Sequence, residues 1–126
     1  MSNERLDALI SDLSFKLIEK INNLESDKKK AFNLIDKALG VLSNDGVYAY
    51  YVYIISQKNS EFNKIFLDTL EEIFNITKNE ETYNLDNRQT YFKDVANDIH
   101  KLLFLKQLLE KTLIYARYHA KALGGD

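Results

Sequence analysis

The chain has 126 residues, a formal net charge of −2, and neither Cys nor Pro; this length fits one self-supporting domain, which we expect to span residues 1–126. The absence of Cys excludes disulfides, thiolate metal ligands and a thiol nucleophile, and it fits the reducing interior of a cell. No apolar stretch approaches the roughly 20 residues that cross a bilayer, so we expect a cytoplasmic protein that does not enter a membrane.

The absence of Pro permits long uninterrupted helices, and the first predicted helix shows apolar residues every three to four positions. Its apolar stripe consists of Leu6, Ile10, Leu13, Leu17, Ile21 and Leu24. A second helix is predicted to start at Ser26 and Asp27, where a capping side chain and an acid near the amino end are favourable. It is expected to end at Gly40 or in the turn at residues 43–46.

The segment 47–55 (VYAYYVYII) is ambiguous between strand and helix. Its β-branched and aromatic residues and the preceding Asp-Gly pair would suit a hairpin. However, residues 38–42 make a poor partner strand, no other candidate strand exists, and a lone two-stranded hairpin is marginal in water. Val47, Tyr51 and Ile54 also fit helical spacing, so we predict a helix.

The remaining chain is predicted to hold two more helices. One follows Ser60, and its apolar side consists of Phe62, Ile65, Phe66, Thr69, Leu70, Ile73 and Phe74. The polar run at 78–84 is expected to be a loop. Thr90 is expected to cap one long final helix that extends to Leu123 and allows a bend near residues 97–98. The sequence thus predicts an all-α, single-domain bundle of about five helices with a long C-terminal helix.

Two apolar stripes run along this final helix. The first is expected to face the core and consists of Leu102, Leu105, Leu109, Leu113, Ala116, Ala120 and Leu123. The second meets either a neighbouring helix or another copy of the chain, and it consists of Phe104, Leu108, Ile114, Tyr115 and Tyr118. Between the stripes lie Lys106, Arg117 and Lys121, with Glu110 neutralising part of the same sector.

Charge is distributed unevenly along the chain. Residues 1–27 contain six acids and three bases, whereas residues 99–123 contain five bases and one acid. This asymmetry favours either the head-to-tail stacking of identical subunits or ordinary solvated helix faces.

A short basic run and one tyrosine are further candidates for nucleic-acid binding. Lys28, Lys29 and Lys30 lie near the start of the second predicted helix. They are a hydrated surface unless the fold brings them near Arg117 and Lys121, in which case they extend a basic surface. Tyr118, beside Arg117, is the best candidate for stacking on unpaired bases.

The sequence contains no motif for catalysis or ligand binding. The four glycines form no phosphate-binding loop, and no Ser lies in a nucleophile elbow. His100 and His119 are too far apart along one helix to chelate one ion. Asp94 and Asp98 are explained more simply as a solvated face beside lysines than as a cation site. We therefore expect no enzyme activity, no metal and no cofactor.

Four features between about residues 27 and 123 carry a resemblance to a known family: the segments 38–42 (ALGVL) and 44–50 (NDGVYAY), a helix from Phe62, and the closing segment 114–123 (IYARYHAKAL). Their order resembles the small α-helical subunit of type III CRISPR effector complexes, particularly the Cmr branch, with the Csm-branch small subunit as the near alternative. In that family, a helix ends near an Asn-Gly pair that leads into an aromatic-rich helix, and a basic, aromatic helix closes the chain. The family often has a Pro in the second helix, which this chain lacks.

The resemblance implies a noncatalytic filament subunit that stacks head-to-tail with copies of itself, beside the other subunits of the effector complex. Its basic helices would contact phosphates of guide RNA and target RNA without reading sequence. The residues expected at these phosphates are Arg117, Lys121, Lys106, Lys28, Lys29 and Lys30. The alternative is a helical protein–protein adaptor that binds no nucleic acid and whose basic face meets an acidic partner.

Overall fold

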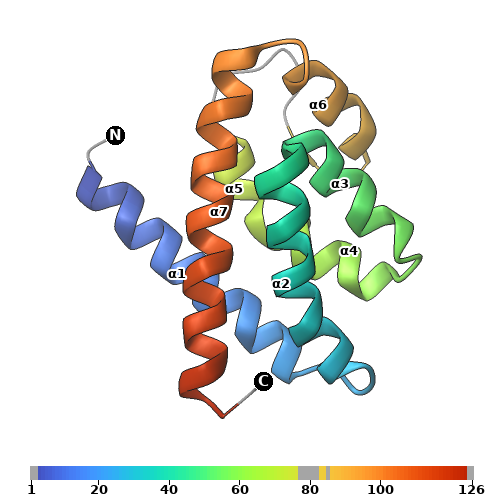
Figure 1. Cartoon of the computed structure of the whole chain (residues 1–126), viewed down its shortest axis with the longest axis vertical. Coiled ribbons are helices and arrows are strands. Elements are labelled where there is room, and N and C mark those ends of the chain that lie inside the picture. Colours follow the sequence, from blue (N-terminus) through green and yellow to red (C-terminus); the bar gives the residue numbers. More distant parts are fainter. Residues whose placement is uncertain (1–2, 77–82, 85, 125–126) are drawn as a thin grey trace.

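The structure is a computed structural model that describes residues 3–76, 83–84 and 86–124 (Figure 1). The described residues form helices and no strand, which confirms the predicted all-α fold. The elements are α1 (Asn3–Asn22), α2 (Lys28–Asp45), α3 (Val47–Ser56), α4 (Ser60–Phe66), the 3₁₀ turn η1 (Asp68–Leu70), α5 (Glu71–Phe74), α6 (Arg88–Val95) and the long C-terminal α7 (Ile99–Ala122).

Helix α7 packs against both α1 and α2 (Figure 1). Most of its predicted core stripe is buried, namely Leu105, Leu109, Leu113, Ala116 and Ala120. Leu108, from the second stripe, is buried as well, because α1 covers that side of α7. The prediction for Leu123 is wrong, since this residue follows the end of α7 and is 59% exposed.

Helix α1 crosses α7 obliquely, with both helices advancing in the same direction (Figure 1). The Lys111 ammonium donates a hydrogen bond to Asp7 Oδ1 at 3.0 Å, and both side chains are about half exposed. Further along both helices, the rings of Phe15 and His119 meet edge-on at 5.8 Å. Both contacts join residues 104 positions apart in the chain, so the two helices advance together in the same direction.

Helix α2 runs antiparallel to α7. The Ser43 hydroxyl donates to Glu110 at 2.8 Å, and Arg117 Nη1 donates to Asp36 Oδ1 at 3.3 Å. A step of seven residues back along α2 therefore matches a step of seven residues forward along α7. Asp27 precedes α2 as predicted, but its side chain caps no backbone N–H and its φ is 63°.

The boundary between α2 and α3 lies at Gly46, whose φ of 96° suits a residue without a Cβ. The helix prediction for 47–55 is confirmed, because α3 covers this segment and buries Val47, Tyr51 and Ile54. Tyr50 is also buried, and its hydroxyl donates to a backbone carbonyl of α4 at 2.7 Å. Tyr50 and Tyr51 thus pack into the core from a helix rather than from a strand.

The prediction of one continuous helix after Ser60 is wrong. The chain instead forms α4, η1 and α5 in succession, and Asn59 caps α4 by accepting hydrogen bonds from the backbone N–H groups of Glu61 and Phe62 at 3.0 and 3.1 Å. Apart from Thr69, the residues predicted for the apolar side are buried, and Leu67 is buried as well: Phe62, Ile65, Phe66, Leu67, Leu70, Ile73 and Phe74. The burial was therefore predicted from periodicity, whereas the breaks between the helices were not.

The long final helix predicted from Thr90 to Leu123 is also interrupted. Helix α6 already begins at Arg88, so Thr90 lies inside it and does not cap a helix. The break between the two helices occupies residues 96–98 and includes the position near 97–98 where a bend was allowed. Asp98 Oδ1 then caps α7 by accepting hydrogen bonds from the backbone N–H groups of His100 and Lys101 at 3.0 and 3.2 Å.

A polar network ties the start of α6 to η1. Residues 78–82 of the predicted loop lie outside the described residues, but Tyr83, which the loop prediction included, is buried. Its hydroxyl donates to Asp68, and Arg88 donates to both oxygens of that carboxylate, with its Nε at 3.1 Å from Oδ1. The hydrogen bond with Asp68 raises the pKa of Arg88, which therefore stays charged.

Replacing Gly40 with Ala is expected to stabilise the fold. Gly40 lies inside α2, and a Cβ added there would meet no atom within 4 Å. We expect Gly40→Ala to raise the free energy of unfolding by about 0.5–1 kcal/mol, because glycine loses more backbone entropy in a helix. Urea unfolding followed by circular dichroism measures this. Gly46→Ala, at φ 96°, should destabilise; a loss of stability in Gly40→Ala would contradict the packing of α2.

Stability is expected to fall at alkaline pH. Burial raises the pKa of Tyr50 above its ordinary value of 10, and burial together with the Asp68 hydrogen bond does the same for Tyr83. Both hydroxyls stay protonated in the folded state, so their contribution is complete below pH 10 and is lost as the pH rises above it. Above pH 10, each of these tyrosines lowers the free energy of unfolding by about 1.4 kcal/mol per pH unit. Tyr50→Phe should reduce the slope in urea titrations; an unchanged slope would contradict the burial of this hydroxyl.

Candidate nucleic-acid interface

Arg117 is engaged with α2 rather than free on an outward ridge. Its Nη1 lies 3.3 Å from Asp36 Oδ1, and the two side chains are 38% and 62% exposed. The sequence did not predict this ion pair. An ion pair this exposed contributes only about 0–1 kcal/mol, so an external anion can compete for the guanidinium.

The helix register brings the predicted lysines of α2 to the same end of the molecule as Lys121. Continuing the antiparallel alignment from the Asp36–Arg117 pair places Lys121 level with residues 32–33 of α2. The run Lys28–Lys30 then lies about 4 to 7 Å further along the helix axis, and all four lysines are exposed. We call Lys28, Lys29, Lys30, Arg117 and Lys121 the basic end.

Lys106 does not belong to the basic end. At 1.5 Å per residue, it lies about 22 Å along α7 from Lys121. It is only half-exposed, and it lines a small apolar groove with Val47, Tyr48 and Leu103 at the junction of α2 and α3. Glu110, expected to neutralise Lys106, accepts the Ser43 hydroxyl instead.

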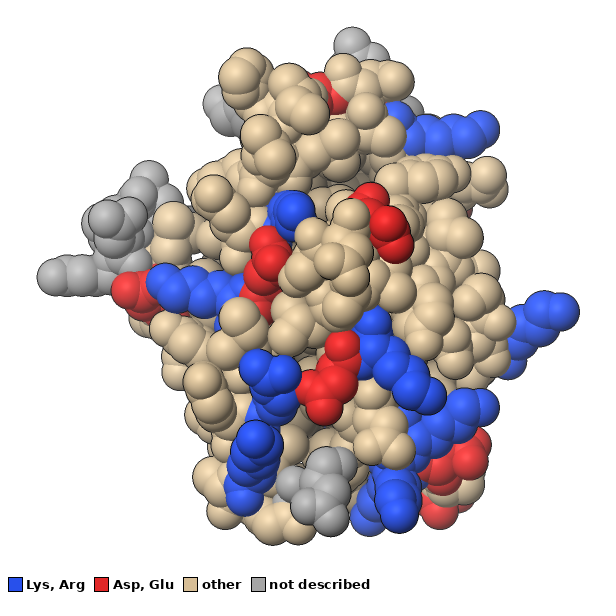
Figure 2. All heavy atoms as spheres, in the orientation of Figure 1, with Lys and Arg blue, Asp and Glu red and all other residues tan. Residues whose placement is uncertain are grey.

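The basic end also contains acidic groups. Figure 2 shows Lys and Arg side chains gathered over the half of this face that holds the carboxyl end of α7 and the amino end of α2, with carboxylates between them. Asp36 pairs with Arg117 of the basic end, and Asp27 directly precedes Lys28. The surface is therefore a locally basic region on a slightly acidic protein, suited to moderate, salt-sensitive attraction of a polyanion.

Tyr118 faces a different side of α7 from Arg117. It is 60% exposed and lines a groove beside α1 together with Ser11, Tyr115 and His119. Arg117, by contrast, reaches α2. A ligand that contacts both residues must therefore pass across the ridge of α7.

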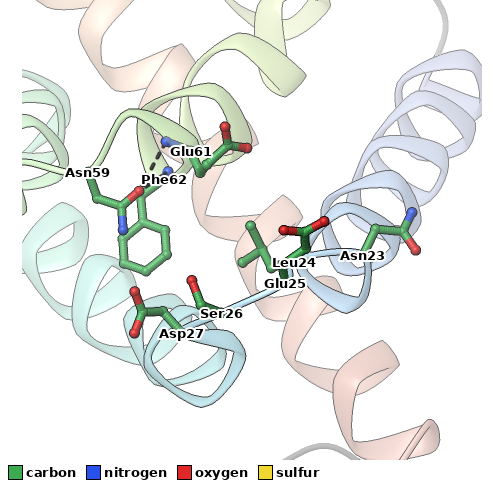
Figure 3. A pocket seen from close by; sticks show the side chains of 8 residues that line it. All are labelled: Asn23, Leu24, Glu25, Ser26, Asp27, Asn59, Glu61 and Phe62. Atoms are coloured by element: carbon green, nitrogen blue, oxygen red, sulfur yellow. Dashed lines mark hydrogen bonds between the residues drawn. The ribbon is translucent and has the colours of Figure 1, made fainter.

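A polar hollow of about 410 Å³ lies between the α1–α2 turn and the start of α4 (Figure 3). Its lining contains Glu25, Asp27 and Glu61 and no basic residue. Figure 3 shows these carboxylates spread around the rim rather than pointing to one centre. The hollow would repel a phosphate, so it lies outside the candidate interface.

The described residues offer little other site chemistry. Among them, no group of three or more His, Cys, Asp or Glu residues is placed to hold a metal ion. Within the same part of the chain, no helix combines the length and apolarity that crossing a bilayer requires. Asp94 and Asp98 were considered as a cation site from their spacing. Asp98 instead caps α7, which gives this acid a structural role.

Two residues beside the predicted ones were missed. Asp36 was not paired with Arg117, because the register between two helices far apart in the chain cannot be read from one sequence. Phe15 was missed although a signal existed: it lies outside the apolar stripe of α1 and is 47% exposed, where a core role does not account for a large aromatic ring.

Removing the carboxylate that holds Arg117 is expected to strengthen polyanion binding. We expect Asp36→Asn to elute from heparin at higher salt and to bind RNA a few-fold more tightly, because Arg117 becomes available. Asp12→Asn is the matched control, since it removes the same charge from the Lys16 pair on α1. Equal shifts in the two variants would reduce the effect to net charge and contradict a specific role for Arg117.

Comparison with known proteins adds no relative. No family model matches the chain, and searches of curated proteins and of solved structures found no significant match. The resemblance to the CRISPR small subunit therefore remains a hypothesis based on the sequence pattern. The candidate interface is defined by the geometry of the chain itself.

Proposed function

We propose that this protein is a noncatalytic small subunit of a type III CRISPR RNA-guided effector complex in the cytoplasm, of the Cmr or the Csm branch. In this role, copies stack head-to-tail along the complex and contact phosphates of guide RNA and target RNA. Cleavage chemistry would belong to other subunits, and this subunit would need no cofactor.

The observation that carries the proposal is the basic end. Two segments that are about 90 residues apart in sequence, Lys28–Lys30 and Arg117 to Lys121, meet at one end of the antiparallel α2–α7 pair. Exposed lysines and arginines grouped in this way attract phosphates without reading sequence. We assign the phosphate contacts to Lys121, Lys28, Lys29 and Lys30 first, then to Arg117, and we leave Lys106 outside them.

The ion pair of Arg117 is compatible with this assignment. Asp36 is 62% exposed, so replacing it by a phosphate costs little desolvation. In this structure, the Arg117 guanidinium donates one hydrogen bond to Asp36. To a phosphate it can donate two parallel hydrogen bonds.

Exposed apolar side chains at the opposite end of α7 support a protein contact. Ile99 and Leu103 are 62% and 51% exposed, and Tyr48 and Val52 of α3 are exposed as well. A head-to-tail stack needs such a surface, since each copy uses two different faces. The same surface equally favours the second candidate function, a helical adaptor that binds a partner protein and no nucleic acid.

The proposal is tested by reversing two charges at the basic end. We expect Arg117→Glu combined with Lys121→Glu to reduce the affinity for single-stranded RNA at least tenfold. The slope of log affinity against log salt concentration should also become shallower, by the amount that corresponds to about two lost phosphate contacts. Fluorescence anisotropy over a salt series measures both quantities. Helical circular dichroism should stay unchanged, because both side chains are at least partly exposed.

A matched control separates position from charge. Lys58→Glu combined with Lys93→Glu makes the same change in lysines away from the basic end, and it should affect RNA binding less. Unchanged RNA affinity in the Arg117 and Lys121 variant would remove the phosphate role. If the tagged wild-type protein, purified gently from its host, carries one partner protein and no RNA, the adaptor function replaces the proposed one.

A further inference from the structure

An open aromatic groove runs between α1 and the carboxyl end of α7. It has a volume of about 380 Å³ and is lined by Ser11, Tyr115, Tyr118, His119 and Ala122. Its lining is mainly aromatic and apolar, and it lies on the α1 side of α7, whereas Asp36 and Arg117 lie on the α2 side. The groove and the basic end thus share the last turns of one helix.

Aromatic side chains in and beside the groove are exposed to solvent. The ring of Phe15 meets that of His119 edge-on, with 86° between the planes, so the two rings stand at right angles. Phe15 is 47% exposed and Tyr118 is 60% exposed. The apolar stripe of α1 is already buried through Leu13 and Leu17, so the fold does not need Phe15 to complete its core.

Near the groove, Lys16 of α1 and Lys111 of α7 are paired with carboxylates, whereas Lys121 of α7 pairs with no described carboxylate, and Glu19 of α1 lies one turn from Phe15. Lys16 pairs with Asp12 at 3.4 Å, and Lys111 pairs with Asp7 at 3.0 Å, so each of these lysines has its own carboxylate. Lys121 lies one helical turn from Tyr118, and no described carboxylate pairs with it. An anion beside the groove would therefore be drawn to the Lys121 side.

We propose that this groove stacks unpaired bases of single-stranded RNA, while the adjoining phosphates lie on the basic end. This inference rests on the proposed function. It adds that the bound RNA must be single-stranded. Side chains three positions apart on a helix are neighbours, so Tyr118 and Lys121 can contact a base and the phosphate beside it. Every base has a π-face, so the stacking does not select sequence. A duplex keeps its bases stacked inside and can use only the basic end.

The test compares variants of the full chain on three probes: an oligoadenylate, the same oligomer with abasic residues, and duplex RNA. We expect Phe15→Ala and Tyr118→Ala each to weaken oligoadenylate binding by about 5- to 100-fold, the effect of losing one stacked base. Tyr118→Trp should retain the affinity, because it keeps a ring. The abasic oligomer and the duplex should bind wild type and both alanine variants equally.

Gln89→Ala is the control, since it truncates an exposed, uncharged side chain on α6, away from the groove, and should change none of these affinities. Oligoadenylate affinity that is unchanged in both alanine variants would overturn the proposal. So would a loss of self-association in analytical ultracentrifugation without any change in RNA affinity, because the groove would then hold a second copy of the chain. If only the Arg117 and Lys121 variant loses RNA binding, the phosphate role survives and the stacking role fails.

Discussion

The packing of α7 between α1 and α2 is the constraint on which the rest of the structure depends. The central part of α7 buries leucines and alanines against both partners, and each partner is fixed by two contacts at the same register. The parallel register of α1 brings Phe15 to His119, and the antiparallel register of α2 brings Lys28–Lys30 toward Lys121. Both proposed binding surfaces are therefore consequences of how two helices align with a third.

Local chemistry was sufficient to predict the helices that have a clear stripe or a clear boundary. Helix α1 follows its apolar periodicity, and α3 follows Gly46, where a positive φ separates two helices. For 47–55, strand propensity was outweighed by the lack of any partner strand, and the buried Tyr50 confirms this reasoning. From Phe62 to Phe74, periodicity predicted most of the buried residues, but it could not locate the breaks at Leu67 and Leu70.

The missed features depend on contacts between residues far apart in the chain. Tyr83 belongs to a polar run, yet it is buried because Asp68 and Arg88 satisfy its hydroxyl and the rings of Phe74 and Tyr91 pack around it. The break before α7, by contrast, lies where the sequence analysis allowed a bend, near residues 97–98, and Asp98 caps the next helix there. At the candidate interface, the basic residues were predictable from composition, but the partner of Arg117 and the distance of Lys106 from the basic end required the helix register.

The account predicts where on the folded chain RNA lies when it is bound. Ultraviolet crosslinking of bound single-stranded RNA, followed by mass spectrometry of the digested protein, measures this position directly. We expect crosslinked nucleotides on peptides that contain Tyr118 or Phe15 and on peptides adjoining Lys28–Lys30, because these segments meet at the carboxyl end of α7. Crosslinks confined to α3, α6 or the amino end of α7 would contradict the account, since RNA would then lie at the opposite end of the helix.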